Sequence, residues 1–129
     1  MFTVLYIEDN QLNMRLVDKT LKPMNYKMLE AWDGQQGLNL ATTQLPDVIL
    51  LDLHLPDMTG IEVAAQLRAS EETAHIPIIA LTADVTEAVK QQCLSGDFDA
   101  YLTKPISRGR LLRTITQMME TKAPAAAAY

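Results

Sequence analysis

Five polar side chains stand where apolar runs of the chain end. Glu8 and Asp9 follow the run "TVLYI", and Asp52 closes the run "DVILL". Thr82 follows "PIIAL", and Lys104 follows "AYLT". Carboxylates, hydroxyls and ammonium groups bind metal ions and phosphate oxygens, so these five residues are the candidates for a functional site.

The three carboxylates carry like charges, and each pair repels by several kcal/mol at short range in a low effective dielectric. A hard divalent cation such as Mg²⁺ removes this conflict, because it prefers carboxylate oxygens, water and phosphate oxygens as ligands. Lys104 is a point charge suited to a phosphoryl oxygen, and Thr82 offers a donor beside it. Asp52 is a possible nucleophile, since carboxylates form aspartyl phosphates.

The chain has no glycine-rich P-loop of the G-x-x-x-x-G-K type. We therefore expect the phosphoryl donor to be something other than ATP held by this chain. A transition-metal site is not favoured either, because His54 and His75 lie after one predicted strand and before the next, at opposite ends of the sheet. Asp57, within "LPDMTG", is interpreted as a turn residue.

The elements that must position these residues alternate along the chain. Short apolar runs predict strands at 3–7, 26–31, 47–51, 77–81 and 98–102. Helical spacing of apolar residues follows each of them, most clearly at Leu111, Leu112, Ile115, Met118 and Met119 and most weakly around Leu38 and Ala41. A further helix is expected around Val85, Ala88 and Val89, and Pro23 is expected to stop the first helix. Strict alternation of strand and helix predicts an α/β fold with a parallel sheet covered on both faces.

Length and composition set the class of protein. The 129 residues fit one domain, 48% of them are apolar, and the net charge of −5 disfavours nucleic acid as a direct partner. No apolar run approaches a membrane span, and the single cysteine, Cys93, is expected to be a buried thiol in a reducing cytoplasm. The tail 122–129 is expected to be disordered or foreign to the natural chain, although its alanines could continue the last helix.

Four motifs together resemble the receiver domain of two-component response regulators: "VLYIEDN", "DVILLDLHLPDMTG", "PIIALTA" and "AYLTKP". The resemblance spans essentially the whole chain, and the single-domain regulators of bacterial cell division and polarity are the most similar kind. It implies a flavodoxin-like, doubly wound (βα)5 fold with a five-stranded parallel sheet in strand order 2-1-3-4-5. Residues 1–121 would form the receiver domain.

The resemblance implies a role for each candidate residue. Asp52 would accept the phosphoryl group from a phosphohistidine on a sensor histidine kinase or a histidine phosphotransfer protein. Asp9, Asp52 and the backbone carbonyl of His54 would hold Mg²⁺, and Glu8 would act through a bound water. The positions that set the lifetime of the phosphoryl group are occupied by His54 and Asp84.

The same resemblance implies a switch. Thr82 and Lys104 would grip the phosphoryl oxygens, and Tyr101 matches the aromatic position that moves inward when Thr82 is drawn toward the phosphate. The change would reach a downstream protein through the face of helix four, strand five and helix five. The peptide bond between Lys104 and Pro105 matches one that is cis in the family. Asn10 and Asn13 could cap the first helix, and they also lie where receivers meet kinase helices.

Three other readings remain beside this one. An enzyme of the haloacid dehalogenase type also forms an aspartyl phosphate, but it needs a second acid where this chain has His54, and no cap domain is present. A flavin-binding module would need a loop rich in Ser, Thr and Gly where this chain has "EDNQLN". A receiver that belongs to a hybrid histidine kinase fits the same motifs. The expected function is thus a signalling domain and not an enzyme, apart from its own phosphorylation and dephosphorylation.

Overall fold

The structure is a computed structural model, and it describes residues 2–83 and 86–127. The strands are β1 (Thr3–Ile7), β2 (Lys27–Ala31), β3 (Val48–Asp52), β4 (Ile78–Thr82) and β5 (Ala100–Thr103). The helices are α1 (Gln11–Leu21), the short 3₁₀ helix η1 (Lys22–Met24), α2 (Gly34–Gln44), α3 (Gly60–Ala69), α4 (Glu87–Ser95) and α5 (Arg108–Ala127).

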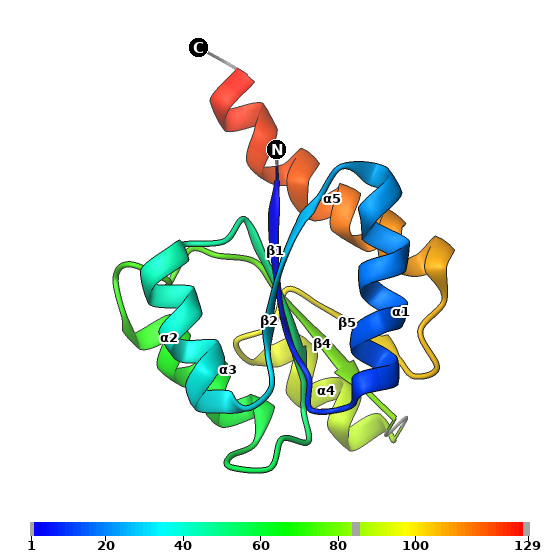
Figure 1. Cartoon of the computed structure of the whole chain (residues 1–129). Coiled ribbons are helices and arrows are strands. Elements are labelled where there is room, and N and C mark those ends of the chain that lie inside the picture. The colour runs from blue at the N-terminus through cyan, green and yellow to red at the C-terminus, as the bar shows by residue number, and fades with distance from the viewer. Residues whose placement is uncertain (1, 84–85, 128–129) are drawn as a thin grey trace.

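The strands form one parallel sheet in the order β2-β1-β3-β4-β5, which confirms the expected fold class. Figure 1 shows α1 and α5 on one face of the sheet and α2, α3 and α4 on the other. The reversal of strand order between β1 and β3 brings the carboxyl ends of these two strands together. In sheets of this kind, that point is where ligands bind.

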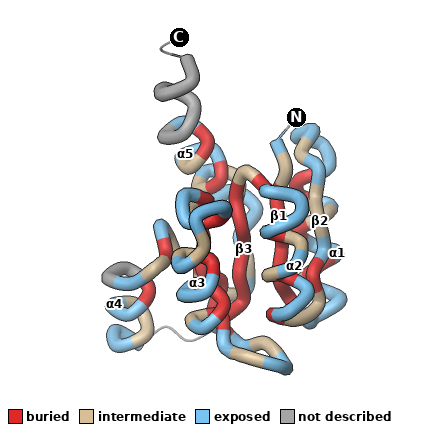
Figure 2. Tube along the Cα trace, turned by 90° about the vertical axis from the view of Figure 1, so that its left-hand side faces the viewer, coloured by how far each residue is buried: buried red, intermediate tan, exposed pale blue. Residues whose placement is uncertain are grey.

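Each face of the sheet has its own apolar core, because side chains of a strand alternate between faces. Along β1, Val4 and Tyr6 pack with the residues of α1 and α5, whereas Leu5 and Ile7 pack with those of α2, α3 and α4. The middle strand β3 is buried along its whole length, as Figure 2 shows. This is the environment that an apolar run without alternation predicts.

Local signals explain where most elements begin and end. The side chain of Asn10 accepts a hydrogen bond from the backbone N of Asn13 at 2.9 Å and caps α1. Pro23 stands in η1, directly after α1 ends, as its fixed backbone requires. Val85 lies outside the described residues, and α4 begins at Glu87 after its cap residue Thr86.

Several boundaries differ from the expectation. Strand β2 begins one residue later than predicted, and β3 and β4 both begin and end one residue later. Strand β5 begins at Ala100 and not at 98, and the backbone N of Asp99, just before it, donates to Ile78 O of β4. Helix α5 continues as far as Ala127, so the alanines extend it. The end of the receiver domain at residue 121 stays a prediction. Within the described part of the chain, no helix combines the length and apolar character that a bilayer crossing requires.

A polar network holds the loops at the amino ends of β4 and β5. The guanidinium of Arg68, at the end of α3, donates to the backbone oxygens of Ala74 at 2.8 Å, Ile76 at 2.6 Å and Asp97 at 3.0 Å. It also donates to Asp99 Oδ2 at 2.8 Å, and the same oxygen accepts from the backbone N of Ile78. One side chain therefore joins the α3–β4 and α4–β5 loops.

Candidate functional site

Three carboxylates gather at the carboxyl ends of β1 and β3. Ile7 pairs with Leu51, so the residues that follow them are neighbours at the same edge of the sheet. One carboxylate oxygen from each of Glu8, Asp9 and Asp52 lies within 4.8 Å of the others. In the residues that the structure describes, these three form the one cluster of metal-ligating side chains, and it includes neither histidine.

The ammonium of Lys104 lies against this cluster. Its Nζ is 2.7 Å from Glu8 Oε2 and 3.1 Å from Asp52 Oδ2. Burial lowers the pKa of Lys104, but the hydrogen bond and charge of Glu8 and the charge of Asp52 outweigh it, so the pKa is raised. Lys104 is therefore charged near neutral pH and offsets part of the acidic charge.

The loop that carries Lys104 is fixed beside β4. The backbone N of Lys104 donates to Thr82 O at 2.8 Å, and the peptide bond between Lys104 and Pro105 is cis. Thr82 pairs with Thr103 across the sheet and is almost fully buried. The described structure thus places Thr82 and Lys104 next to each other at the end of the sheet.

Glu8 is buried and receives hydrogen bonds from three directions. Besides Lys104, the hydroxyl of Tyr6 donates to Glu8 Oε2 at 2.8 Å, and the backbone N of Asn10 donates to Glu8 Oε1 at 3.2 Å. Burial, together with the negative charge of Glu8, raises the pKa of Tyr6 well above its ordinary value. In the sequence Tyr6 has the pattern of an apolar strand residue. Its position two residues before Glu8, on the same face of a strand, is the only sequence signal of the hydrogen bond between them.

Asp52 lies under a tight loop between β3 and α3. Its Oδ1 accepts a hydrogen bond from the backbone N of His54 at 3.0 Å, and the carboxylate is almost fully buried. A Cβ at Gly60 would lie 2.5 Å from the backbone oxygen of Asp52 and 2.8 Å from Leu53 Cα. Only glycine allows this approach, so Gly60 sets how closely the loop folds back on the end of β3.

Asp57 does more than turn the chain. Its two carboxylate oxygens accept from the backbone N of Gly34 at 2.8 Å and of Gln35 at 3.0 Å, at the start of α2. These hydrogen bonds, led by the one from Gly34, lower the pKa of Asp57. The side chain of Met58 packs so closely on Gly34 that a Cβ there would lie 2.5 Å from it. The loop after β3 is therefore fastened to α2.

Tyr101 stands apart from the acidic cluster. It lies on β5 opposite Ala80, it is half-buried, and the Nζ of Lys90 on α4 is 5.9 Å from the centre of its ring. Between the β3–α3 loop and α4 is a cavity of about 210 Å³ that Thr82 lines together with Leu53, His54, Thr59, Ile61, Val89 and Gln92. Asp84 lies outside the described residues.

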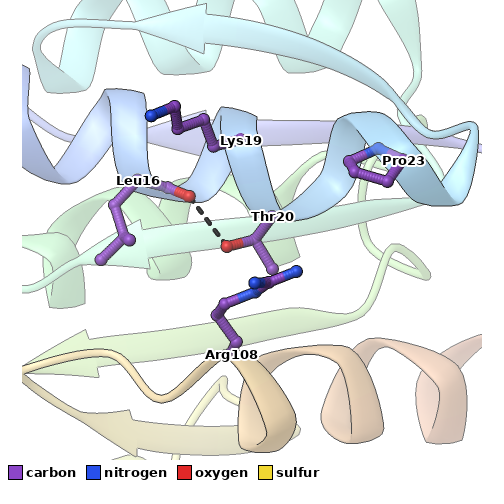
Figure 3. Close-up of a pocket in the computed structure, with 5 residues that line it drawn as sticks. All are labelled: Leu16, Lys19, Thr20, Pro23 and Arg108. Atoms are coloured by element: carbon purple, nitrogen blue, oxygen red, sulfur yellow. Dashed lines mark hydrogen bonds between the residues drawn. The ribbon is translucent and has the colours of Figure 1, made fainter.

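A second cavity lies between α1 and the start of α5. It measures about 380 Å³ and is lined by Leu16, Lys19, Thr20, Pro23 and Arg108. In Figure 3 the side chain of Arg108 reaches toward Thr20, whose hydroxyl donates to Leu16 O. This cavity contains no carboxylate, so it is separate from the acidic cluster.

The arrangement is an acidic edge with one cation and one hydroxyl at the ends of parallel strands. A family model for the response regulator receiver domain matches residues 4–116. The chain belongs to this family. Receiver domains are the signalling domains of two-component systems, and the all-oxygen donor set of this receiver is compatible with Mg²⁺.

Individual relatives are similar over most of this receiver. The polar-differentiation response regulator DivK of Brucella ovis is 38% identical over 113 residues, which cover 88% of this chain and 92% of that protein. The receiver domain of the sensor histidine kinase PA1611 from Pseudomonas aeruginosa, solved with a magnesium ion in its active-site cleft, is 32% identical with a TM-score of 0.85. The alignment covers 92% of this chain and 98% of that one.

A chemotaxis protein is similar to this receiver in both sequence and fold. CheY4 of Vibrio cholerae is 30% identical with a TM-score of 0.85, over 92% of this receiver and 98% of that chain.

Proposed function

We propose that Asp52 is the phosphoacceptor of this receiver and takes its phosphoryl group from a phosphohistidine of a sensor kinase or a histidine phosphotransfer protein. A carboxylate oxygen of Asp52 attacks phosphorus while the P–N bond breaks, and the electron pair remains on the imidazole nitrogen. The product is an acyl phosphate on Asp52, which water later hydrolyses.

The observation that carries this proposal is the position of Lys104. Its Nζ contacts the carboxylates of both Glu8 and Asp52, which places a fixed positive charge beside the proposed nucleophile. A phosphoryl group on Asp52 would bring new anionic oxygens to this point, and Lys104 would bind one of them. Thr82, next to Lys104 at the end of the sheet, would donate to another.

The donor set fits a hard divalent cation, and we assign Asp9, Asp52 and the backbone carbonyl of His54 as direct ligands of Mg²⁺. Glu8 would act through a bound water, because its own oxygens already accept from Tyr6, Asn10 and Lys104. When bound, Mg²⁺ supplies charge neutralisation for the incoming phosphoryl oxygens.

The output of the reaction would be a change of surface. Movement of Thr82 toward the phosphoryl group would free space behind it, next to the cavity that Thr82 lines. Tyr101 would then turn inward and leave the neighbourhood of Lys90, which changes the face formed by α4, β5 and α5. A downstream protein would read this face.

The donor protein would meet the receiver at α1, beside the acidic edge. Two apolar side chains of α1 stand in solvent, with Leu12 exposed by 74% and Leu16 by 39%, and Leu16 borders the cavity of Figure 3. A helical kinase or phosphotransfer domain offers the apolar face that would cover them. The proposed compartment is the cytoplasm.

A second reading places this receiver in a hybrid histidine kinase. The likeness to the PA1611 receiver, which belongs to a sensor histidine kinase, favours it. The chemistry of Asp52 is the same in both cases, and the difference lies in whether the donor is on the same chain.

The proposal is tested by intact mass after incubation with Mg²⁺ and acetyl phosphate. We expect one added phosphoryl group on the wild type and none on Asp52→Asn. Removal of Mg²⁺ with EDTA should abolish the addition. A folded wild type that gains no mass with either acetyl phosphate or a phosphorylated histidine phosphotransfer protein contradicts the proposal.

A further inference from the structure

Tyr6 is a buried polar residue that the proposed reaction does not use. Its ring packs among the apolar residues of the α1 and α5 side, and its exposed fraction is 0%. A hydroxyl in such surroundings is costly unless it has a hydrogen-bond partner. Its partner is Glu8, two residues further along the same face of the strand, at 2.8 Å. The backbone N of Glu8 donates to Ala31 O, so the extended path of β1 continues to this residue.

The hydroxyl of Tyr6 and the ammonium of Lys104 share one acceptor. Both donate to Glu8 Oε2, at 2.8 Å and 2.7 Å, while Oε1 accepts from the backbone N of Asn10 at 3.2 Å. Lys104 extends the chain of contacts to Asp52 Oδ2 at 3.1 Å. A continuous line of hydrogen bonds therefore runs from the core beneath the sheet edge to the proposed nucleophile.

We propose that Tyr6 is a positioning residue for the metal site. Its hydroxyl helps to hold the Glu8 carboxylate in an orientation that keeps an oxygen within 4.8 Å of those of Asp9 and Asp52. A glutamate side chain has three rotatable bonds and loses this freedom when it is ordered. Tyr6, together with Lys104 and the backbone N of Asn10, restricts this freedom before the ion arrives, which favours binding. The inference rests on the proposed Mg²⁺ site.

A purely structural role for Tyr6 makes a different prediction. If the residue only fills space between β1, α1 and α5, the isosteric change Tyr6→Phe keeps that packing and leaves Mg²⁺ affinity unchanged. If the hydroxyl positions Glu8, the same change weakens Mg²⁺ binding by about ten-fold, the usual effect when a group that orients a metal ligand is lost.

The experiment is a Mg²⁺ titration of the full chain without any phosphoryl donor, followed by calorimetry and by the shift of the melting temperature. The variants are Tyr6→Phe, the matched control Tyr26→Phe, Glu8→Gln and the double variant of Tyr6→Phe with Glu8→Gln. Tyr26 serves as the control because it is partly buried on the same side of the sheet and its ring contacts Phe2.

We expect a dissociation constant about ten-fold higher for Tyr6→Phe and unchanged for Tyr26→Phe. In the Glu8→Gln background, Tyr6→Phe should have no further effect, because Tyr6 acts through Glu8. The inference is overturned if Tyr6→Phe and wild type bind Mg²⁺ with equal affinity. It is also overturned if Tyr6→Phe loses the same ten-fold affinity in the wild-type and the Glu8→Gln backgrounds. Either result leaves the proposed metal site itself standing. A wild type that binds no Mg²⁺ overturns both the metal site and the inference.

Discussion

Lys104 and Glu8 form an ion pair across 96 residues of sequence, with the ammonium 2.7 Å from a carboxylate that is 1% exposed. Breaking such a pair from one side leaves a buried charge without its partner. Lys104→Met should therefore lower the free energy of unfolding by about 2 kcal/mol in EDTA. Urea denaturation measures this loss. Lys22→Met, which removes an exposed cation 3.9 Å from Asp18, should cost almost nothing. Equal stability of Lys104→Met and wild type would show that the pair contributes no net stability.

Asp9 is the exposed member of the acidic cluster, so its charge can be removed without opening the core. Asp9→Asn relieves repulsion from Glu8 and Asp52, and in EDTA it should raise the melting temperature by roughly 2–4 °C. The same variant should lose the further rise that Mg²⁺ gives the wild type. Glu72→Gln, an exposed acid outside the cluster, should change neither quantity. A melting temperature of Asp9→Asn at or below that of wild type in EDTA would contradict this account of the cluster.

Arg68 should be important for stability and irrelevant to the site. Arg68→Ala removes its hydrogen bonds to two loops and should lower the free energy of unfolding by about 2–3 kcal/mol, with Mg²⁺ affinity unchanged. Arg68→Lys should recover only a small part of the lost free energy of unfolding, because an ammonium cannot reproduce the planar fork of donors of a guanidinium. The exposed Arg113→Ala is the control. Full restoration by lysine would show that charge alone explains the effect.

Asp57 should make stability depend on pH in acid. Its pKa is lowered in the folded state, so its contribution is present above the unfolded value of about 3.9 and is lost as the pH falls through the folded value. The difference in free energy of unfolding between wild type and Asp57→Ala should be constant near neutral pH and should shrink below about pH 4. Denaturation curves of wild type and Asp57→Ala across this pH range measure it. If the difference in free energy of unfolding stays constant down to pH 2.5, the ionised carboxylate of Asp57 is not its source.

Apolar patterning predicted the fold well, because both faces of the sheet are covered and strands such as "DVILL" and "IPIIAL" show no polar interruption. The acidic cluster followed from topology, since the ends of β1 and β3 must be neighbours in a doubly wound sheet. The contacts of Tyr6, Asp57 and Arg68 could not be predicted. Tyr6 has the pattern of a core residue, and Asp57 and Arg68 bond to backbone groups whose position depends on the packing of other elements.

The Arg68 network lies at the amino ends of β4 and β5, whereas Glu8, Asp52 and Lys104 lie at the carboxyl ends of the strands. The sheet therefore keeps the Arg68 network, which joins two loops, at the opposite edge from the acidic cluster and Lys104. Sequence changes in the two loops that Arg68 joins can shift the folded population while the acidic edge keeps its geometry. A receiver of this build can therefore gain or lose stability during evolution through residues that lie far from its acidic cluster.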